Sequence, residues 1–137
     1  MTVAVSDLAA ARRFFALLGF EEDKAVVICG PVMDRYMGVP GIEADHVTLA
    51  LKDASPRCEI QLLHYRKPAA ARDPTVARLD KIGFNHICFA VSDIDAMIAK
   101  VTAAGVKLRN QPMVFHGRKL VFLEGPEGIV VELAEWT

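Results

Sequence analysis

Apolar residues in the first half of the chain recur with the two spacings that distinguish strands from helices. Short apolar or alternating runs predict strands at residues 2–7, 25–29, 46–52 and 58–65. Between the first two strands, residues 8–18 place apolar side chains on one helical face. Ser6 or Asp7 can cap this predicted helix, and Gly19 is a usual residue for ending it.

The segment between the second and third predicted strands, residues 31–45, is predicted to be an irregular loop. Its Gly38, Pro40 and Gly41 disfavour a regular element, yet many of its other residues are apolar. Long loops in compact domains are often functional. This segment is therefore either a hydrophobic cover over the core or a lid over a bound substrate.

The second half of the chain begins with a predicted linker and then returns to the earlier pattern. Residues 67–80 contain two prolines and an alanine run, which predict a linker with at most one helical turn. A helix is predicted over residues 94–104, again with a Ser-Asp cap and a glycine stop. Strands are predicted from residue 83 and near residues 107–108, 118–123 and 129–134.

The two halves are an internal repeat, and this repeat predicts the fold. Ala4-Val5-Ser6-Asp7-Leu8 matches Ala90-Val91-Ser92-Asp93-Ile94, and Gly19 matches Gly105 at the same offset. The element order β-α-β-β-β thus occurs twice. We expect an α+β domain over residues 1–137, in which two βαβββ modules form one curved mixed sheet around a cavity with the helices outside. Its predicted parts are module one at about 1–66, a linker at about 67–82 and module two at about 83–137.

Two polar residues interrupt the apolar strands that open and close module two. His86 lies in the strand that begins module two, and Glu132 lies in the last strand of the chain. Because side chains alternate across a strand, His86, Cys88 and Ala90 share one face. Glu132 likewise shares a face with Val130 and Ala134. A His and a Glu in such places are either a hydrogen-bonded pair or part of a metal site.

The composition narrows the class of protein. The net charge is −1, so nothing indicates a nucleic-acid or membrane-surface partner. No apolar run is long enough for a spanning helix, and no signal peptide is recognisable. Cys29, Cys58 and Cys88 are an odd number without metal-type spacing, and we expect buried free thiols. A cytoplasmic protein is the resulting expectation.

The sequence resembles the vicinal-oxygen-chelate superfamily, which includes glyoxalase I, methylmalonyl-CoA epimerase, extradiol dioxygenases and the fosfomycin and bleomycin resistance proteins. The paired Val-Ser-Asp helix starts and the paired glycine stops carry the resemblance over the whole chain. His86 opens the second module, and Gly-Pro-Glu-Gly-Ile-Val-Val-Glu-Leu closes it around Glu132. The resemblance implies the fold more strongly than the activity, because the superfamily hosts several kinds of function.

The resemblance also implies a ligand set for a divalent metal ion. Metal-dependent members take ligands from the first and last strands of each module, and these positions fall on Gln61, His86 and Glu132. A Gln at the first of these resembles the epimerase branch. The repeat places the fourth position just before Met1, so a residue upstream, a three-ligand site and a metal-free protein all stay open.

These ligand types suit particular ions and a particular reaction. Imidazole, carboxylate and amide ligands suit Zn, Ni, Co, Mn or Fe. Such an ion can chelate two neighbouring substrate oxygens and stabilise the enolate formed when a proton leaves the adjacent carbon. Glu132 is the candidate catalytic base as well as a ligand. Glu43, Met37 and Arg118 are candidate substrate contacts.

Two further expectations concern the location of the remaining histidines and the function of the protein. His46, His64 and His116 are predicted to be surface or turn residues. The predicted function is a metal-dependent lyase or isomerase that transfers a proton next to a carbonyl of a small molecule. A drug-binding protein of the bleomycin-resistance type is the alternative, and an extradiol-type dioxygenase is the third. We also expect a homodimer, because relatives with two modules commonly pair.

Overall fold

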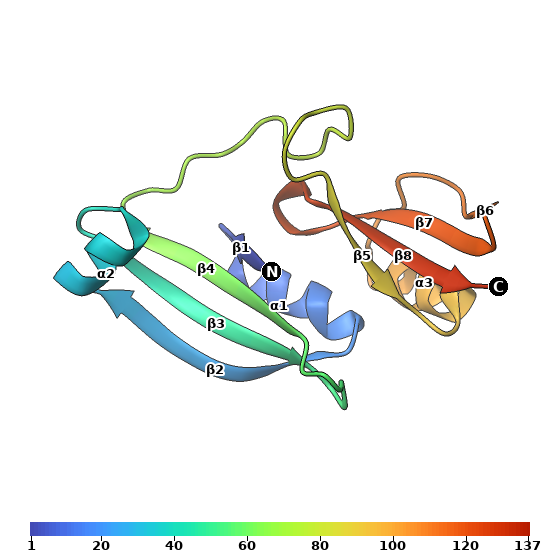
Figure 1. Ribbon diagram of the computed structural model, residues 1–137, viewed down its shortest axis with the longest axis horizontal. Helices are drawn as coiled ribbons and strands as arrows, with labels where there is room; N and C mark the ends of the chain where they lie inside the picture. Colours follow the sequence, from blue (N-terminus) through green and yellow to red (C-terminus); the bar gives the residue numbers. More distant parts are fainter. The chain divides into compact units, whose positions relative to one another are not determined.

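The computed structural model describes residues 1–137, and these residues divide into two compact units (Figure 1). Unit one spans Met1–Arg72 and unit two spans Asp73–Thr137, so the division falls inside the predicted linker. Unit one contains β1 (Thr2–Ala4), α1 (Leu8–Leu17), β2 (Phe20–Cys29), α2 (Pro31–Met37), β3 (Glu43–Leu51) and β4 (Glu59–Lys67). Unit two contains β5 (His86–Ala90), α3 (Ile94–Ala103), β6 (Met113–Phe115), β7 (Arg118–Glu124), the short 3-10 helix η1 (Pro126–Gly128) and β8 (Val130–Trp136).

Each unit contains a four-stranded mixed sheet of the same topology. The strand order is β1-β4-β3-β2 in unit one and β5-β8-β7-β6 in unit two. The parallel pairs are β1 with β4 and β5 with β8, which are the first and last strands of each unit in chain order. The other neighbouring strands are antiparallel. The α+β class and the two βαβββ modules are therefore confirmed, and the strands pair as one four-stranded sheet per module.

The internal repeat is visible in individual hydrogen bonds. Asp7 caps α1 by accepting from the Ala10 amide at 2.9 Å, and Asp93 caps α3 by accepting from the Ala96 amide at 2.9 Å. Both helices are followed by a glycine with positive φ, 93° at Gly19 and 89° at Gly105. A side chain would be strained there, which explains the glycine at the same offset in both modules.

One long helix packs against each sheet and closes its core. In unit one, Phe15 is fully buried and makes edge-to-face ring contacts with Phe14 and Phe20, with centroids 5.2 Å and 6.1 Å away. In unit two, Ile94 and Val101 of α3 are fully buried, as are Val131 and Leu133 of β8. The latter two alternate with Glu132, so the opposite face of β8 is the one that carries the candidate site.

The prediction of an irregular loop over residues 31–45 is wrong, because this segment contains α2 and the start of β3. Pro31 occupies the first turn of α2, where its missing amide hydrogen costs nothing. Gly38 ends the helix in the left-handed conformation, with φ 68°. The Asp34 carboxylate then accepts from the Ile42 amide at 2.9 Å and holds the connection to β3. Of the residues that were interpreted as loop markers, Gly38 is the stop signal of a short helix, and Pro40 and Gly41 follow it.

Several smaller expectations also need correction. Residues 107–108 form no strand: Leu108 makes an isolated bridge to Leu123, and the missing sheet strand is β6. The three cysteines are free, as predicted, but Cys29 and Cys88 are exposed and Cys58 is half-buried. His46 and His64 lie half-buried within strands, whereas His116 is in the predicted turn. The linker contains turns and no helix.

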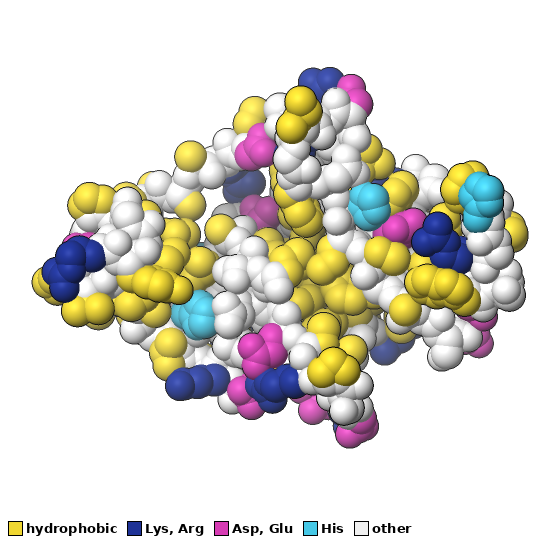
Figure 2. All heavy atoms as spheres, in the orientation of Figure 1, with side chains coloured by type: hydrophobic (Ala, Val, Ile, Leu, Met, Phe, Trp, Pro, Cys, Tyr) yellow, Lys and Arg dark blue, Asp and Glu magenta, His cyan; other side chains and the backbone are white.

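The face of the molecule drawn in Figure 2 is mixed in charge. On the face drawn in Figure 2, basic and acidic side chains are interspersed with apolar ones, and neither sign gathers into a large patch. None of the helices has both the length and the apolar character needed to cross a membrane.

The two aspartate caps generate a prediction about stability. Asp93→Ala should lower the free energy of unfolding of unit two by about 1 kcal/mol, because the Ala96 amide loses its acceptor. Asp93→Ser is the matched control, since serine caps nearly as well, and it should be close to wild type. Urea denaturation followed by circular dichroism measures both. Equal losses for Ala and Ser would show that the cap does not stabilise the helix.

Candidate active site

His86 and Glu132 lie together on one face of the sheet in unit two. The His86 Nε2 atom lies 3.3 Å from a Glu132 carboxylate oxygen. The parallel pairing of β5 and β8 produces this contact, because it sets Cys88 opposite Glu132 and His86 opposite Val130. The side chains are 32% and 15% exposed, so the pair is accessible from solvent yet mostly covered. A base at this position can reach a ligand while its charge stays poorly screened.

The neighbours of His86 hold its ring in place. The ring packs edge-to-face against Phe122 of β7, with centroids 5.1 Å apart. Its second nitrogen, Nδ1, lies 2.7 Å from the Asn85 side-chain oxygen. The imidazole is thus fixed on two sides, and Nε2 is the nitrogen directed at Glu132.

Cys88 is the third polar side chain on this face. Partial burial, followed by the hydrogen bond and the negative charge of Glu132, raises the pKa of the Cys88 thiol to about 11. Arg118 acts weakly in the opposite direction. The thiol is therefore protonated at neutral pH, which makes it a donor to Glu132 and a poor nucleophile. Sequence alternation placed Cys88 beside His86 but did not reveal its contact with Glu132.

A pocket of about 240 Å³ opens beside Glu132. Its wall is apolar apart from Glu132 and Asn110, and the other lining residues are Met113, Phe115, Leu120, Val121 and Phe122. Sequence reasoning missed this pocket, because β6, which supplies Met113 and Phe115, was not predicted. Glu132 is thus the one carboxylate in the wall of an apolar pocket.

Arg118, a predicted substrate contact, lies at the start of β7. Its guanidinium stacks over the Trp136 ring at 5.7 Å from the ring centroid. Alternation along β7 places Arg118 on the same face as Leu120 and Phe122, which line the pocket. The structure therefore puts a cation on the face of the sheet that carries Glu132.

Gln61, the predicted ligand in unit one, occupies the position in its module that Glu132 occupies in unit two. Thr2 pairs with Gln61 as Cys88 pairs with Glu132. Val5 donates to the Leu63 carbonyl at 2.8 Å, and Val91 donates likewise to the Ala134 carbonyl at 2.9 Å. The Gln61 side-chain oxygen accepts from the Thr2 hydroxyl at 3.2 Å. The equivalence drawn from sequence therefore agrees with the strand register.

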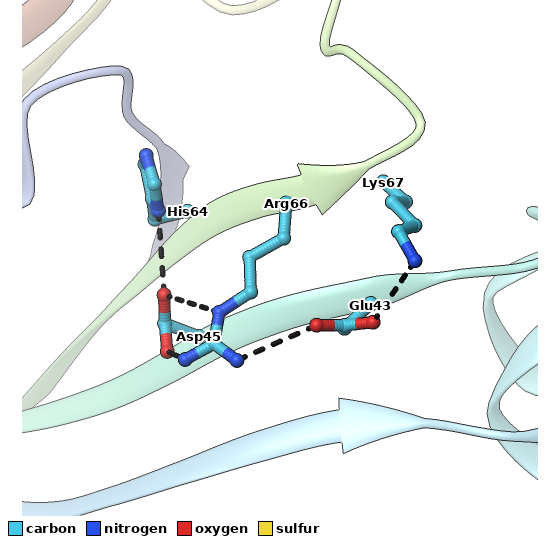
Figure 3. Close-up of polar contacts among 5 residues, drawn as sticks. All are labelled: Glu43, Asp45, His64, Arg66 and Lys67. Carbon is cyan, nitrogen blue, oxygen red and sulfur yellow. Dashed lines mark hydrogen bonds and ion pairs between the residues drawn. The ribbon is translucent and has the colours of Figure 1, made fainter.

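Glu43, another candidate substrate contact, belongs to an ion-pair cluster on β3 and β4 (Figure 3). Arg66 contacts Glu43 at 3.4 Å and Asp45 at 2.6 Å, and Lys67 lies 3.7 Å from Glu43. His64 Nδ1 lies 3.3 Å from Asp45. The hydrogen bond from Arg66 holds the pKa of Asp45 below its usual value, so Asp45 is a weak proton acceptor. Met37, the third candidate contact, is half-buried at the end of α2 in the same unit.

Among residues 1–137, no three His, Cys, Asp or Glu side chains gather as a metal site. His86 and Glu132 are the pair of predicted ligands that the structure brings into contact. Imidazole nitrogen and carboxylate oxygen suit a borderline-to-hard divalent ion such as Zn²⁺ or Mn²⁺. The donor chemistry of this pair therefore fits part of a divalent-metal site.

Comparison with known proteins extends the resemblance. Residues 1–122 match the family model described as the Glyoxalase/Bleomycin resistance protein/Dioxygenase superfamily. The chain is 30% identical to an ethylmalonyl-CoA/methylmalonyl-CoA epimerase from Cereibacter sphaeroides, over 98% of this chain and 94% of that protein. A glyoxalase family protein from Bacillus cereus superimposes with a TM-score of 0.89 at 24% identity, over 99% and 91% of the two chains. A fosfomycin resistance protein from Listeria monocytogenes, crystallised with Mn(II) and sulfate, gives a TM-score of 0.62 at 15% identity, over 99% and 88%.

The contact between Cys88 and Glu132 generates a prediction about the thiol. In a Cys29→Ser, Cys58→Ser background, Glu132→Gln should move the Cys88 pKa from about 11 toward 9.0, because the thiolate loses a repelling charge. The pH dependence of alkylation by iodoacetamide measures this pKa. Glu124→Gln, at the exposed end of β7, is the control and should leave it unchanged. An unaltered profile in Glu132→Gln would contradict the contact.

Proposed function

The chain belongs to the glyoxalase/bleomycin resistance protein/dioxygenase superfamily, and we propose that it is an enzyme that moves a proton next to a carbonyl of a small molecule. The proposed class is a divalent-metal-dependent isomerase or lyase. The observation that carries this proposal is Glu132, a mostly covered carboxylate beside a histidine and in the wall of an apolar pocket. The epimerase relative, aligned over nearly the whole chain, favours the isomerase side of this class.

Glu132 is the proposed proton acceptor. In the proposed step its carboxylate takes the proton from the carbon next to the carbonyl, so that a C–H bond breaks and an O–H bond forms. The protonated carboxyl then returns a proton to the substrate, which leaves no net oxidation or reduction. Low exposure favours this use, because a base in a covered site acts on its substrate with little competition from water.

His86, Glu132 and Gln61 are the proposed metal ligands. His86 and Glu132 present a nitrogen and an oxygen to each other at 3.3 Å, and Gln61 occupies the repeat-equivalent position in unit one. A divalent ion bound by these residues would act as a Lewis acid toward the substrate carbonyl. Zn, Ni, Co, Mn and Fe all tolerate such ligands.

The pocket supports a substrate with an apolar group next to the reacting carbon. Leu120, Phe122 and Met113 offer no hydrogen-bond partners, so a hydroxyl or charge placed among them would be desolvated at a cost. Arg118 is the proposed contact for an anionic part of the substrate, and Met37 and Glu43 are further proposed contacts. A short 2-alkyl acyl thioester with a second carboxylate has these features.

The proposed enzyme is also expected to be a homodimer, as is common for two-module proteins. Light scattering at working concentration tests this part separately from the chemistry. A monomer would remove the dimer from the proposal and leave the assignment of Glu132 untouched.

Substitution of the proposed ligands tests metal binding and proton transfer together, because Glu132 is proposed to serve in both. Glu132→Gln should lower the rate of deuterium exchange into a 2-alkyl acyl thioester by on the order of 100-fold or more, because it removes the base. His86→Ala should weaken Zn²⁺ binding by about tenfold or more and leave the fold intact, since its side chain is partly exposed. Gln61→Glu should retain or tighten the ion, because it adds charge at an oxygen ligand.

Exchange followed by NMR and metal content by elemental analysis are the two measurements. Glu124→Gln is the control for loss of a carboxylate and should match wild type in both. A wild-type protein that binds no divalent metal and exchanges no proton would overturn the enzyme proposal. Tight binding of an apolar ligand by that protein would instead favour a binding function of the bleomycin-resistance type.

A further inference from the structure

Asn85 joins the segment before β5 to the ring of His86. Its side-chain amide nitrogen donates to the Leu79 carbonyl at 2.7 Å. Its side-chain oxygen lies 2.7 Å from His86 Nδ1. Asn85 is half-buried, and the segment around Leu79 is tied by the ion pairs of Arg78 with Asp80 and of Lys81 with Asp73.

These two contacts decide which atom of Asn85 faces the histidine. A carbonyl oxygen only accepts hydrogen bonds, so the Asn85 atom next to Leu79 must be the NH₂ group. The atom next to His86 Nδ1 is then the oxygen, which also only accepts. His86 must therefore donate from Nδ1, and on the neutral ring this leaves Nε2 with a lone pair and no hydrogen.

The lone pair on Nε2 is directed at another acceptor. The Glu132 oxygen 3.3 Å away is a carboxylate oxygen, and two acceptors at this distance repel unless a proton or a cation lies between them. We propose that Asn85 is a positioning residue that locks His86 in the Nδ1–H tautomer. Nε2 of His86 and the Glu132 carboxylate then both offer unprotonated lone pairs as ligands to a divalent cation. This inference rests on the metal site of the proposed function and names the residue that prepares it.

Without Asn85, the neutral ring has a better alternative. Its proton would move to Nε2, where the Glu132 carboxylate accepts it, and the two ligands would then be occupied with each other. A metal ion would have to displace that hydrogen bond. The loss in affinity should resemble that for other partners that orient a ligating histidine, about 10- to 100-fold.

The test uses the full-length protein and three variants. Asn85→Ala removes the acceptor at Nδ1, whereas Asn85→Asp keeps an oxygen there, loses the donor to Leu79 and adds a negative charge. Ile82→Ala is the matched control, because Ile82 lies in the same segment and is 104% exposed. Thermal melting checks that each variant folds.

The first readout is the ¹⁵N shifts of the His86 ring in metal-free protein, at a pH where the ring is neutral. Wild type, Asn85→Asp and Ile82→Ala should show the Nδ1–H tautomer, and Asn85→Ala should shift toward Nε2–H. The second readout is the affinity for Zn²⁺ by calorimetry. It should fall at least about tenfold in Asn85→Ala, change little in Ile82→Ala, and stay the same or rise in Asn85→Asp, where a carboxylate replaces the amide oxygen at Nδ1.

The two readouts separate the inference from the proposed function. An Nε2–H tautomer in wild type, or equal shifts in wild type and Asn85→Ala, would overturn the role of Asn85. An Nδ1–H tautomer in a wild-type protein that binds no Zn²⁺ would uphold the lock and overturn the metal site. Equal losses of affinity in Asn85→Ala and Asn85→Asp would show that the Leu79 contact, not the acceptor at Nδ1, controls the site.

Discussion

The candidate site of unit two depends on how a histidine and a carboxylate are brought face to face. His86 Nε2 and Glu132 lie 3.3 Å apart, and the Asn85 side-chain oxygen accepts a hydrogen bond from the other ring nitrogen, Nδ1. Both atoms that meet are therefore acceptors when the ring is neutral. Such a contact is repulsive unless a proton or a cation lies between its members, and this is the basis for proposing the pair as part of a cation site.

Close packing holds the strand that carries Glu132 and the ring of His86 in place. Glu132 alternates with Val131 and Leu133, which are fully buried against the helix side of the sheet. Val130 and Ala134, on its own face, are fully buried as well. The strand cannot slip by one residue without burying the carboxylate in the core. Phe122, from the neighbouring strand, fixes the imidazole by an edge-to-face contact.

The repeat explains how much of the fold could be predicted from the sequence. Capping aspartates and glycine stops at one offset act locally, so they identify both helices without any tertiary information. Helix α2 could not be predicted this way, because Pro31 and Gly38 mark a loop as readily as the ends of a short helix. Strand β6 was missed because its three residues are all exposed and lack an alternating pattern.

Part of the candidate site could also be predicted from local sequence patterns, and part of it could not. The faces of His86, Cys88 and Glu132 followed from strand alternation, and the register confirms that they share one side of the sheet. Alternation does not tell whether other elements cover a face of the sheet. Cys88 was therefore expected to be buried, but it is exposed. The pocket and the role of Asn85 depend on contacts between segments distant from the strand pattern, namely β6 and the turn at Leu79.

X-ray absorption of the protein loaded with one equivalent of Zn²⁺ is the most direct test of the cation site at this pair. The account predicts one imidazole nitrogen at about 2.0–2.1 Å among oxygen ligands. In His86→Ala the imidazole contribution should disappear. A spectrum without an imidazole contribution in wild type, or one unchanged by His86→Ala, would contradict the account.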